Sequence, residues 1–255
     1  MQERPGTARG APRILPDIPM PISLSLLFKA ALLCPLAWLS ITIAHSAGMV
    51  PQTPVLVVEE GVGEAVMNVR NTDLHPALLH SSVKNVEQDD EILLLVTPPL
   101  ARVEAGSIQQ VRFILQNPRS LQVERLKRVV FEGIAPAADS SGARVSLGIR
   151  QNLPVILRPA GLAVEREPWK RLSWSATPGG LQVFNPSPYV VRLAKAFVPL
   201  PGSDMANLPR TYILPGERLN IALPLSTSVR TMSVRIYPAT TYGFSVEHFD
   251  APVTR

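Results

Sequence analysis

Short apolar runs separated by turn residues dominate the chain from residue 54 onward. In the segment 144–150, Val145, Leu147 and Ile149 hold every second position, and small or polar residues stand between them. A period of two is typical of a β-strand with one apolar face. We therefore predict an all-β protein, and no window of the mature chain predicts a sustained, capped helix.

The apolar runs fall into two series, which indicates two domains. Seven runs lie between residues 54 and 159, and a second series begins after Pro159. Strands of this length and spacing are typical of antiparallel β-sandwiches. We predict a first domain over residues 48–159 and a second over residues 160–255, each long enough to bury its own core.

The first 47 residues have a different character. In the segment 20–47, Lys29 precedes a short apolar run that ends in small residues before Gly48. This pattern predicts a cleaved export signal. A membrane anchor is the alternative, but the run is short for a bilayer span and contains Pro35. We expect residues 1–47 to be an N-terminal extension and signal peptide, and the mature protein to have no membrane span.

Charge and cysteine content narrow the function classes. The chain has 25 Lys and Arg against 20 Asp and Glu, and the part from Gly48 onward has 21 against 18. An excess of three charges is too small to indicate a nucleic-acid partner. Cys34, the only cysteine, lies within the signal, so the exported protein has no disulfide and depends on packing for its stability.

No catalytic or metal-binding constellation stands out. The sequence has no nucleophile elbow, zinc-protease motif, phosphate-binding loop or dinucleotide fingerprint. His75 and His80 are five residues apart, which is not a spacing of metal ligands on a helix or strand. We therefore expect no enzymatic activity, no cofactor and no bound metal.

Two charged clusters have simple structural interpretations. Asp89 and Asp90 stand in a polar segment between two apolar runs, where we expect them to cap a hairpin turn. Arg125, Lys127 and Arg128 precede an apolar run. We expect a solvated strand end there, and a nucleic-acid patch is the less favoured alternative.

Two proline-bearing segments give information about the path of the chain. Consecutive prolines remove backbone donors, so residues 97–106 cannot be a central strand and must be a crossing or edge segment. In residues 184–191, Asn-Pro and Ser-Pro pairs predict a tight turn that enters an apolar strand.

Taken together, these motifs resemble the periplasmic chaperones of pilus assembly, the PapD-like family. The correspondence extends over residues 50–245, and its main segments are TPPLARVEAG (97–106), RVVFEGIAP (128–136), VSLGIRQNLPVILRP (145–159) and VFNPSPYVV (183–191). The resemblance implies two immunoglobulin-like β-sandwich domains in an L-shaped arrangement. It also implies a periplasmic, ATP-independent chaperone that binds pilus (fimbrial) subunits and delivers them to an outer-membrane usher.

The resemblance gives the alternating segment at 144–150 a function. Chaperones of this family donate the seventh strand of their first domain to an incomplete subunit fold, which is a form of β-augmentation. Counting back from Arg158 places Val145, Leu147 and Ile149 at the donor positions. The alternative is that these three side chains face the protein's own sandwich.

The chain departs from the family where the subunit's C-terminal carboxylate is usually bound. The family's Arg on the first strand corresponds by counting to Leu56, and its Lys on the seventh strand corresponds to Pro154. Neither side chain can bind an anion. We expect Arg150, on the same strand, to provide the cation; a solvent-facing role for Arg150 is the alternative.

The resemblance further implies an ion network between the domains. Arg102 and Glu124 are retained for this network, whereas Thr241 stands where the family has an acid in the second domain. We therefore expect Arg102 and Glu124 to be interdomain residues.

An immunoglobulin-like adhesin or another structural surface protein is the main alternative to a chaperone. A pilus subunit would lack a strand and typically carry cysteines, whereas the mature chain has two full strand series and no cysteine. A secreted hydrolase would need convergent acid–base residues, which the sequence does not display. The preferred hypothesis is a subunit-binding chaperone.

Overall fold

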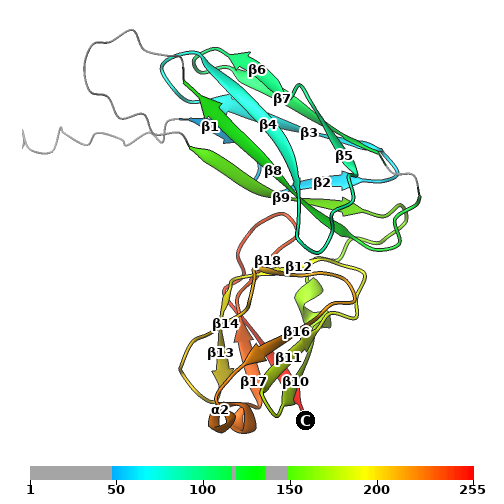
Figure 1. Cartoon of the computed structure of the whole chain (residues 1–255), viewed down its shortest axis with the longest axis vertical. Coiled ribbons are helices and arrows are strands. Elements are labelled where there is room, and N and C mark those ends of the chain that lie inside the picture. Colours follow the sequence, from blue (N-terminus) through cyan, green and yellow to red (C-terminus); the bar gives the residue numbers. More distant parts are fainter. Residues whose placement is uncertain (1–47, 117–118, 136–148) are drawn as a thin grey trace, which may run out of the picture. The chain divides into compact units, whose positions relative to one another are not determined.

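The computed structural model describes residues 48–116, 119–135 and 149–255, and nearly all of their regular structure is β (Figure 1). The strands before residue 160 are β1 (Met49–Pro51), β2 (Leu56–Glu59), β3 (Glu64–Asn71), β4 (Ala77–Asn85), β5 (Leu94–Thr97), β6 (Leu100–Val103), β7 (Ile108–Leu115), β8 (Arg125–Ile134) and β9 (Arg150–Arg158).

The elements after residue 160 continue the β-structure with two short helices. They are the 3₁₀-helix η2 (Pro168–Arg171), β10 (Ser173–Thr177), β11 (Gly180–Phe184), β12 (Val191–Leu193), β13 (Ala196–Leu200), β14 (Ala206–Asn207), β15 (Tyr212–Ile213), β16 (Arg218–Ala222), the helix α2 (Leu225–Arg230), β17 (Ser233–Ile236), β18 (Pro238–Ala239) and β19 (Phe249–Thr254). The six residues of α2 follow Pro224 and have no side-chain cap, so no capping pattern predicted a helix there.

The first domain is a sandwich of two sheets. Within the described residues, one sheet has the strand order β1-β3-β7-β5 and the other has the order β2-β9-β8-β4-β6. Alternate residues of both sheets point inward, as in Phe113 of β7 and Phe131 of β8, whose ring centroids are 6.3 Å apart. The predicted all-β sandwich is confirmed, because the period of two puts one face of each strand into this core.

The proline segment redirects the chain, as predicted. Strand β5 ends at Thr97 and pairs with β7 in the first sheet, whereas β6 begins at Leu100 and pairs with β4 in the second. Pro98 and Pro99 lie between the two strands. The chain therefore changes sheets at the point where consecutive prolines remove two ladder donors.

The second domain has its own apolar core. Trp174 and Phe197 pack in this core with their ring centroids 5.6 Å apart. Among the described residues, the strands of the domain form one sheet with the order β14-β13-β17-β19-β10-β11-β16 and a smaller sheet with the order β15-β12-β18. The predicted turn at 184–191 is formed around buried Asn185. Its Nδ2 donates to the carbonyl of Tyr189, and its Oδ1 accepts from Ser187.

Candidate functional site

Strand β9 is unevenly paired along its two edges. On one edge it pairs with β8 from Arg150 to Leu157. On the other edge, β2 pairs only with residues 155–158. No strand among the described residues covers that second edge at residues 150–154. The first half of β9 therefore presents an open edge, which is the feature that a strand of another chain can extend.

The apolar face of β9 continues beyond the protein's own core. Leu153, Val155 and Leu157 alternate on the inner face and pack in the first-domain core. Ile149 has the same parity, but its side chain is 41% exposed and lies beside Gly48. Among the predicted donor residues, Ile149 is thus on the core face at the end of that core, while Val145 and Leu147 lie outside the described residues.

Arg150 already has an anionic partner in the free protein. Its Nη2 donates to both carboxylate oxygens of Glu132, at 2.9 Å each, and both residues are register partners on β9 and β8. The Arg150 side chain is 63% exposed. A carboxylate from another protein would have to compete with Glu132 for this guanidinium.

Leu56, which counting places at the position of the family's first-strand arginine, faces the protein core and not a cleft. Leu56 is 5% exposed and packs in the first-domain core. Its neighbours Val55 and Val57 point to the opposite side, where they pack with Ile156. Leu56 faces the core because β2 pairs in parallel with β9, and this register puts Leu56 opposite Val155 on the inner face. Pro154 is buried and is the register partner of Arg128.

Glu124 connects the two domains. Its Oε2 accepts from the backbone N–H of Val190 at 2.9 Å, and its Oε1 accepts from Nε of Arg158 at 3.2 Å. Burial raises the pKa of Glu124, and the Val190 N–H and Arg158 oppose that rise. Arg158, only 2% exposed, also donates to Glu59. One nitrogen of Arg158, Nη2, is buried without a partner among the described atoms.

The sequence predicts both Arg102 and Glu124 as interdomain residues, but of the two only Glu124 bonds to the second domain among the described contacts. The guanidinium of Arg102 is 66% exposed and donates to Glu104 at 2.7 Å. Arg102 lies on β6, at the opposite edge of the five-strand order from β2 and β9. Arg158 occupies the place beside Glu124 instead. Thr241, at the expected acid position, donates its hydroxyl to the carbonyl of Glu165.

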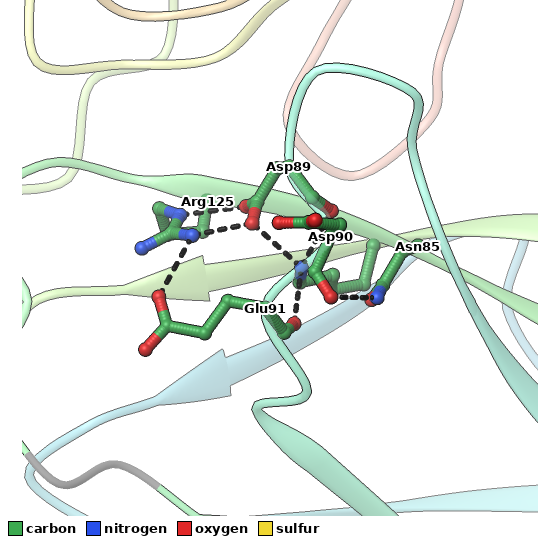
Figure 2. Close-up of polar contacts among 6 residues, drawn as sticks. Asn85, Asp89, Asp90, Glu91 and Arg125 are labelled. Carbon is green, nitrogen blue, oxygen red and sulfur yellow. Dashed lines mark hydrogen bonds and ion pairs between the residues drawn. The ribbon is translucent and has the colours of Figure 1, made fainter.

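A polar network lies inside the first domain at the start of β8. Nζ of Lys127 donates to Oδ1 of Asp89 at 2.8 Å and to the carbonyls of Asp89 and Glu91 at 2.9 and 2.7 Å. Figure 2 shows Arg125 beside the Asp89 carboxylate, with Glu91 also within reach of the guanidinium. The loop after β4 is thereby fixed to β8 through two cations and one buried carboxylate.

This network overturns the prediction of a solvated strand end. The Lys127 side chain is 0% exposed and that of Asp89 is 7% exposed. Burial alone would raise the pKa of Asp89, but hydrogen bonds from Arg125 and Lys127 hold it below the ordinary value. Burial lowers the pKa of Lys127, and Asp89 partly offsets this effect. Asp89 does stand in the predicted turn, where its N–H donates to the carbonyl of Val86.

The sequence contained the signal for this network. Lys127 has the parity of Val129 and Phe131, both in the core, so strand alternation alone places its side chain inward. A buried lysine requires a carboxylate partner. The two aspartates of the predicted turn were candidates for this partner, although Glu124 lies nearer to Lys127 along the chain.

Metal sites and membrane-spanning helices are both absent from the described part of the chain. Among the described residues, no group of three or more His, Cys, Asp and Glu side chains is placed to hold a metal ion. In the same residues, no helix has the length and apolar character needed to cross a bilayer.

Comparison with known proteins gives matches for both domains. Residues 48–163 match the PapD N-terminal domain of pili and flagellar-assembly chaperones, and residues 167–249 match the C-terminal domain of the pili assembly chaperone PapD. An uncharacterized fimbrial chaperone, YhcA of Escherichia coli K12, is 46% identical over 200 residues, which cover 78% of this chain and 88% of YhcA.

More distant relatives are similar over comparable lengths. The chaperone protein MrkB of Klebsiella pneumoniae is 25% identical over 196 residues, covering 72% of this chain and 83% of MrkB. The solved complex of the Salmonella enterica SafA pilin with the SafB chaperone contains a chain with the same fold. Its TM-score is 0.68 at 21% identity, covering 82% of this chain and 98% of that one.

The two-domain fold and the matched domain families define the class of protein. The chain belongs to the family of PapD-like pilus assembly chaperones, which confirms the predicted resemblance. It is accordingly a fimbrial chaperone built from two β-sandwich domains.

Proposed function

We propose that this protein binds pilus subunits in the periplasm by adding its segment 145–154 to the subunit's sheet, and then delivers them to an outer-membrane usher. The observation that carries the proposal is the open edge of β9 at residues 150–154. A subunit strand can pair with that edge through main-chain hydrogen bonds.

The alternating apolar side chains provide the remaining contacts. Val145, Leu147 and Ile149 share one parity, and at Ile149 that face is already free of the protein's own core. Burying three such side chains in a subunit contributes about 1.5–3 kcal/mol each before ordering costs. That range suits a complex that must form readily and later be replaced by another subunit's strand.

Arg150 belongs to the same proposal as a polar contact beside the donated strand. Its guanidinium lies on the opposite face from Ile149 and can turn from Glu132 to a subunit carboxylate. We expect Arg150→Ala to weaken capture, with a smaller effect at high salt because the wild-type contact is then already screened.

Capture of subunits from the periplasm tests the strand-donation proposal. The tagged wild-type protein should retain a pilus subunit that mass spectrometry identifies, in a one-to-one complex. Leu147→Asp places a charge in an apolar groove, so the subunit should be lost while the chaperone stays folded. Ile108→Asp, an exposed position on the other sheet, is the matched control and should capture normally. Unfolding of the Leu147→Asp protein, or normal capture by it, would contradict the proposal.

Periplasmic location depends on the export signal. Met49 is 1% exposed and packs in the first-domain core, so a mature chain that begins at Gly48 keeps the core complete. N-terminal sequencing of the exported protein should give Gly48 as the first residue. Retention of residues 20–47 in a membrane fraction would contradict this part of the proposal.

A further inference from the structure

The loop formed by residues 86–91, between β4 and β5, reaches the second domain. Val86 is 7% exposed and belongs to a buried apolar cluster that includes Val190 of the second domain. Gln88, two residues further along, accepts a hydrogen bond at 2.8 Å from the hydroxyl of Tyr212, whose ring packs against the same cluster. The 86–91 loop therefore meets the second domain through one apolar and one polar side chain.

The backbone of the 86–91 loop is fixed from inside the first domain. The ammonium group of Lys127 donates to the carbonyls of Asp89 and Glu91 as well as to the Asp89 carboxylate. Figure 2 shows the side-chain amide of Asn85 donating to the carbonyl of Asp90. The carbonyls of three successive loop residues are therefore bonded by side chains that begin on β4 and β8.

Tyr212 is also held in place on its own side of the junction. The guanidinium of Arg210 lies over the Tyr212 ring, 5.0 Å from its centroid, and is paired with Glu217. Glu217 accepts a second hydrogen bond, from the N–H of Leu214 at 2.9 Å, and Leu214 packs against the cluster that contains Val86. The hydroxyl that reaches Gln88 thus comes from a braced turn.

Two backbone hydrogen bonds cross the junction at Glu124. Its N–H donates to the carbonyl of Pro188 at 2.8 Å, and its carboxylate accepts from the N–H of Val190 at 2.9 Å. Two domains of one chain move relative to each other unless their interface is large and apolar. The contact of Gln88 with Tyr212 adds a further attachment, which restricts the rotation that the attachment at Glu124 allows.

We propose that the 86–91 loop is a latch between the two domains, and that the buried pair of Lys127 and Asp89 sets its position. The hydrogen bonds of Lys127 described above all end in the first domain, so its effect on the second domain passes through the loop. Water competes for an exposed bond between two side chains, which makes that bond weak. Fixing the loop beforehand lowers the entropy cost of placing Gln88 against Tyr212.

Hydrogen exchange at the junction tests the latch in the purified exported protein, without a subunit. Gln88→Ala removes the acceptor and Tyr212→Phe removes the donor. Each variant should exchange the Val190 amide about two- to tenfold faster, because the junction opens more readily. The double variant should exchange no faster than the faster single variant, since both changes remove the same bond.

Gln110→Ala is the matched control for this experiment. Gln110 is an exposed glutamine on β7, in the other sheet of the first domain, and its replacement should leave exchange at Val190 unchanged. Unchanged exchange at Val190 in both Gln88→Ala and Tyr212→Phe would overturn the latch. So would a double variant whose increase is the product of the two single increases.

A second measurement tests whether Lys127 positions the latch. If Lys127→Met displaces the loop, Gln88 no longer meets Tyr212, and adding Gln88→Ala should then change exchange at Val190 by less than twofold. Asn85→Ala, which frees the carbonyl of Asp90 at an exposed position, should have the same consequence and serves if Lys127→Met fails to fold. An equal effect of Gln88→Ala with and without the loosened loop would overturn the positioning role.

Residual dipolar couplings distinguish positioning from plain stabilisation of the first domain. In the wild-type protein the two domains should share one alignment tensor. In Gln88→Ala and in Lys127→Met the tensor magnitude of the second domain should differ from that of the first, because the domains then reorient separately. A network that only stabilises the first domain would lower its unfolding midpoint and leave the two tensors equal. Equal tensors in both variants would overturn the proposal.

Discussion

Lys127 and Arg128 are neighbours on β8, and their environments are opposite. The Lys127 side chain points inward, is fully buried and is neutralised by Asp89. The Arg128 side chain points to the outer face, and among the described residues its hydrogen-bond partner is the neutral Asn152. Lys127 therefore holds the fold together through an internal carboxylate, whereas Arg128 has no acidic partner among the described residues.

The comparison also predicts how each region responds to mutation. Removing one member of a buried ion pair leaves the other charge buried and unpaired, which is strongly destabilising. Removing the charge of Arg128, which bonds only to neutral acceptors among the described residues, costs the fold little. Substitutions on the inner face of β8 should therefore lower the free energy of unfolding more than substitutions on its outer face.

The largest effect on stability is expected at Asp89. In Asp89→Asn, the buried ammonium of Lys127 keeps its charge and loses its carboxylate, at a cost of about 3–5 kcal/mol in the free energy of unfolding. Denaturant unfolding of the purified protein measures this cost. Asp90→Asn, at the adjacent exposed position, is the control and should change stability by less than about 0.5 kcal/mol. Equal costs at both positions would contradict the role assigned to the network.

A smaller loss is expected when the buried cation itself is removed. In Lys127→Met, Asp89 keeps Arg125 and no buried ammonium remains, but the carbonyls of Asp89 and Glu91 lose their donor. The expected cost is about 1–2 kcal/mol in the free energy of unfolding. The comparison fails if Lys127→Met is more destabilising than Asp89→Asn in the same denaturation experiment.

The pH dependence of stability gives a third comparison. The pKa of Asp89 in the folded protein lies below its ordinary value of 3.8, so the unfolded chain binds its proton first as the pH falls. The stability contributed by Asp89 is complete above that ordinary value and is lost as the pH falls through the folded pKa. The stability difference between wild-type protein and Asp89→Asn should therefore narrow in acid. A difference that is the same at pH 7 and pH 3 would argue against an ionised Asp89.

The smallest effect on stability is expected at Arg128. Arg128→Gln removes repulsion toward Arg192 and can keep hydrogen bonds to Asn152, so the free energy of unfolding should change by less than about 0.5 kcal/mol. Thermal or denaturant unfolding checks this. A loss comparable to that of Asp89→Asn would mean that Arg128 has a structural role, and the contrast between the two faces would not hold.

Strand periodicity predicted the β-sandwich fold because a period of two directly reports which side chains enter the core. The same rule would have placed Lys127 inward, had it been applied to the charged residues as well as to the apolar ones. Counting along a motif was less informative. It assigned Leu56 to the cleft, although the register of β2 with β9 turns Leu56 into the core and leaves Val55 and Val57 on the other side.

The residues around the junction could not be predicted from short-range sequence patterns. Glu124 binds Arg158 and the Val190 N–H, which are 34 and 66 residues away along the chain. Arg102 carries the charge expected for this network, but the strand order places it at a distant edge. Only the three-dimensional register decides which of several arginines reaches a given carboxylate.

Hydrogen exchange on the chaperone with and without its captured subunit tests the central claim most directly. Strand donation predicts that, within residues 145–153, the backbone amides that do not bond to β8 exchange faster in the free protein and become protected in the complex, because the open edge of β9 is then paired. Protection confined to other segments, with unchanged exchange at residues 145–153 in a stable complex, would contradict the account.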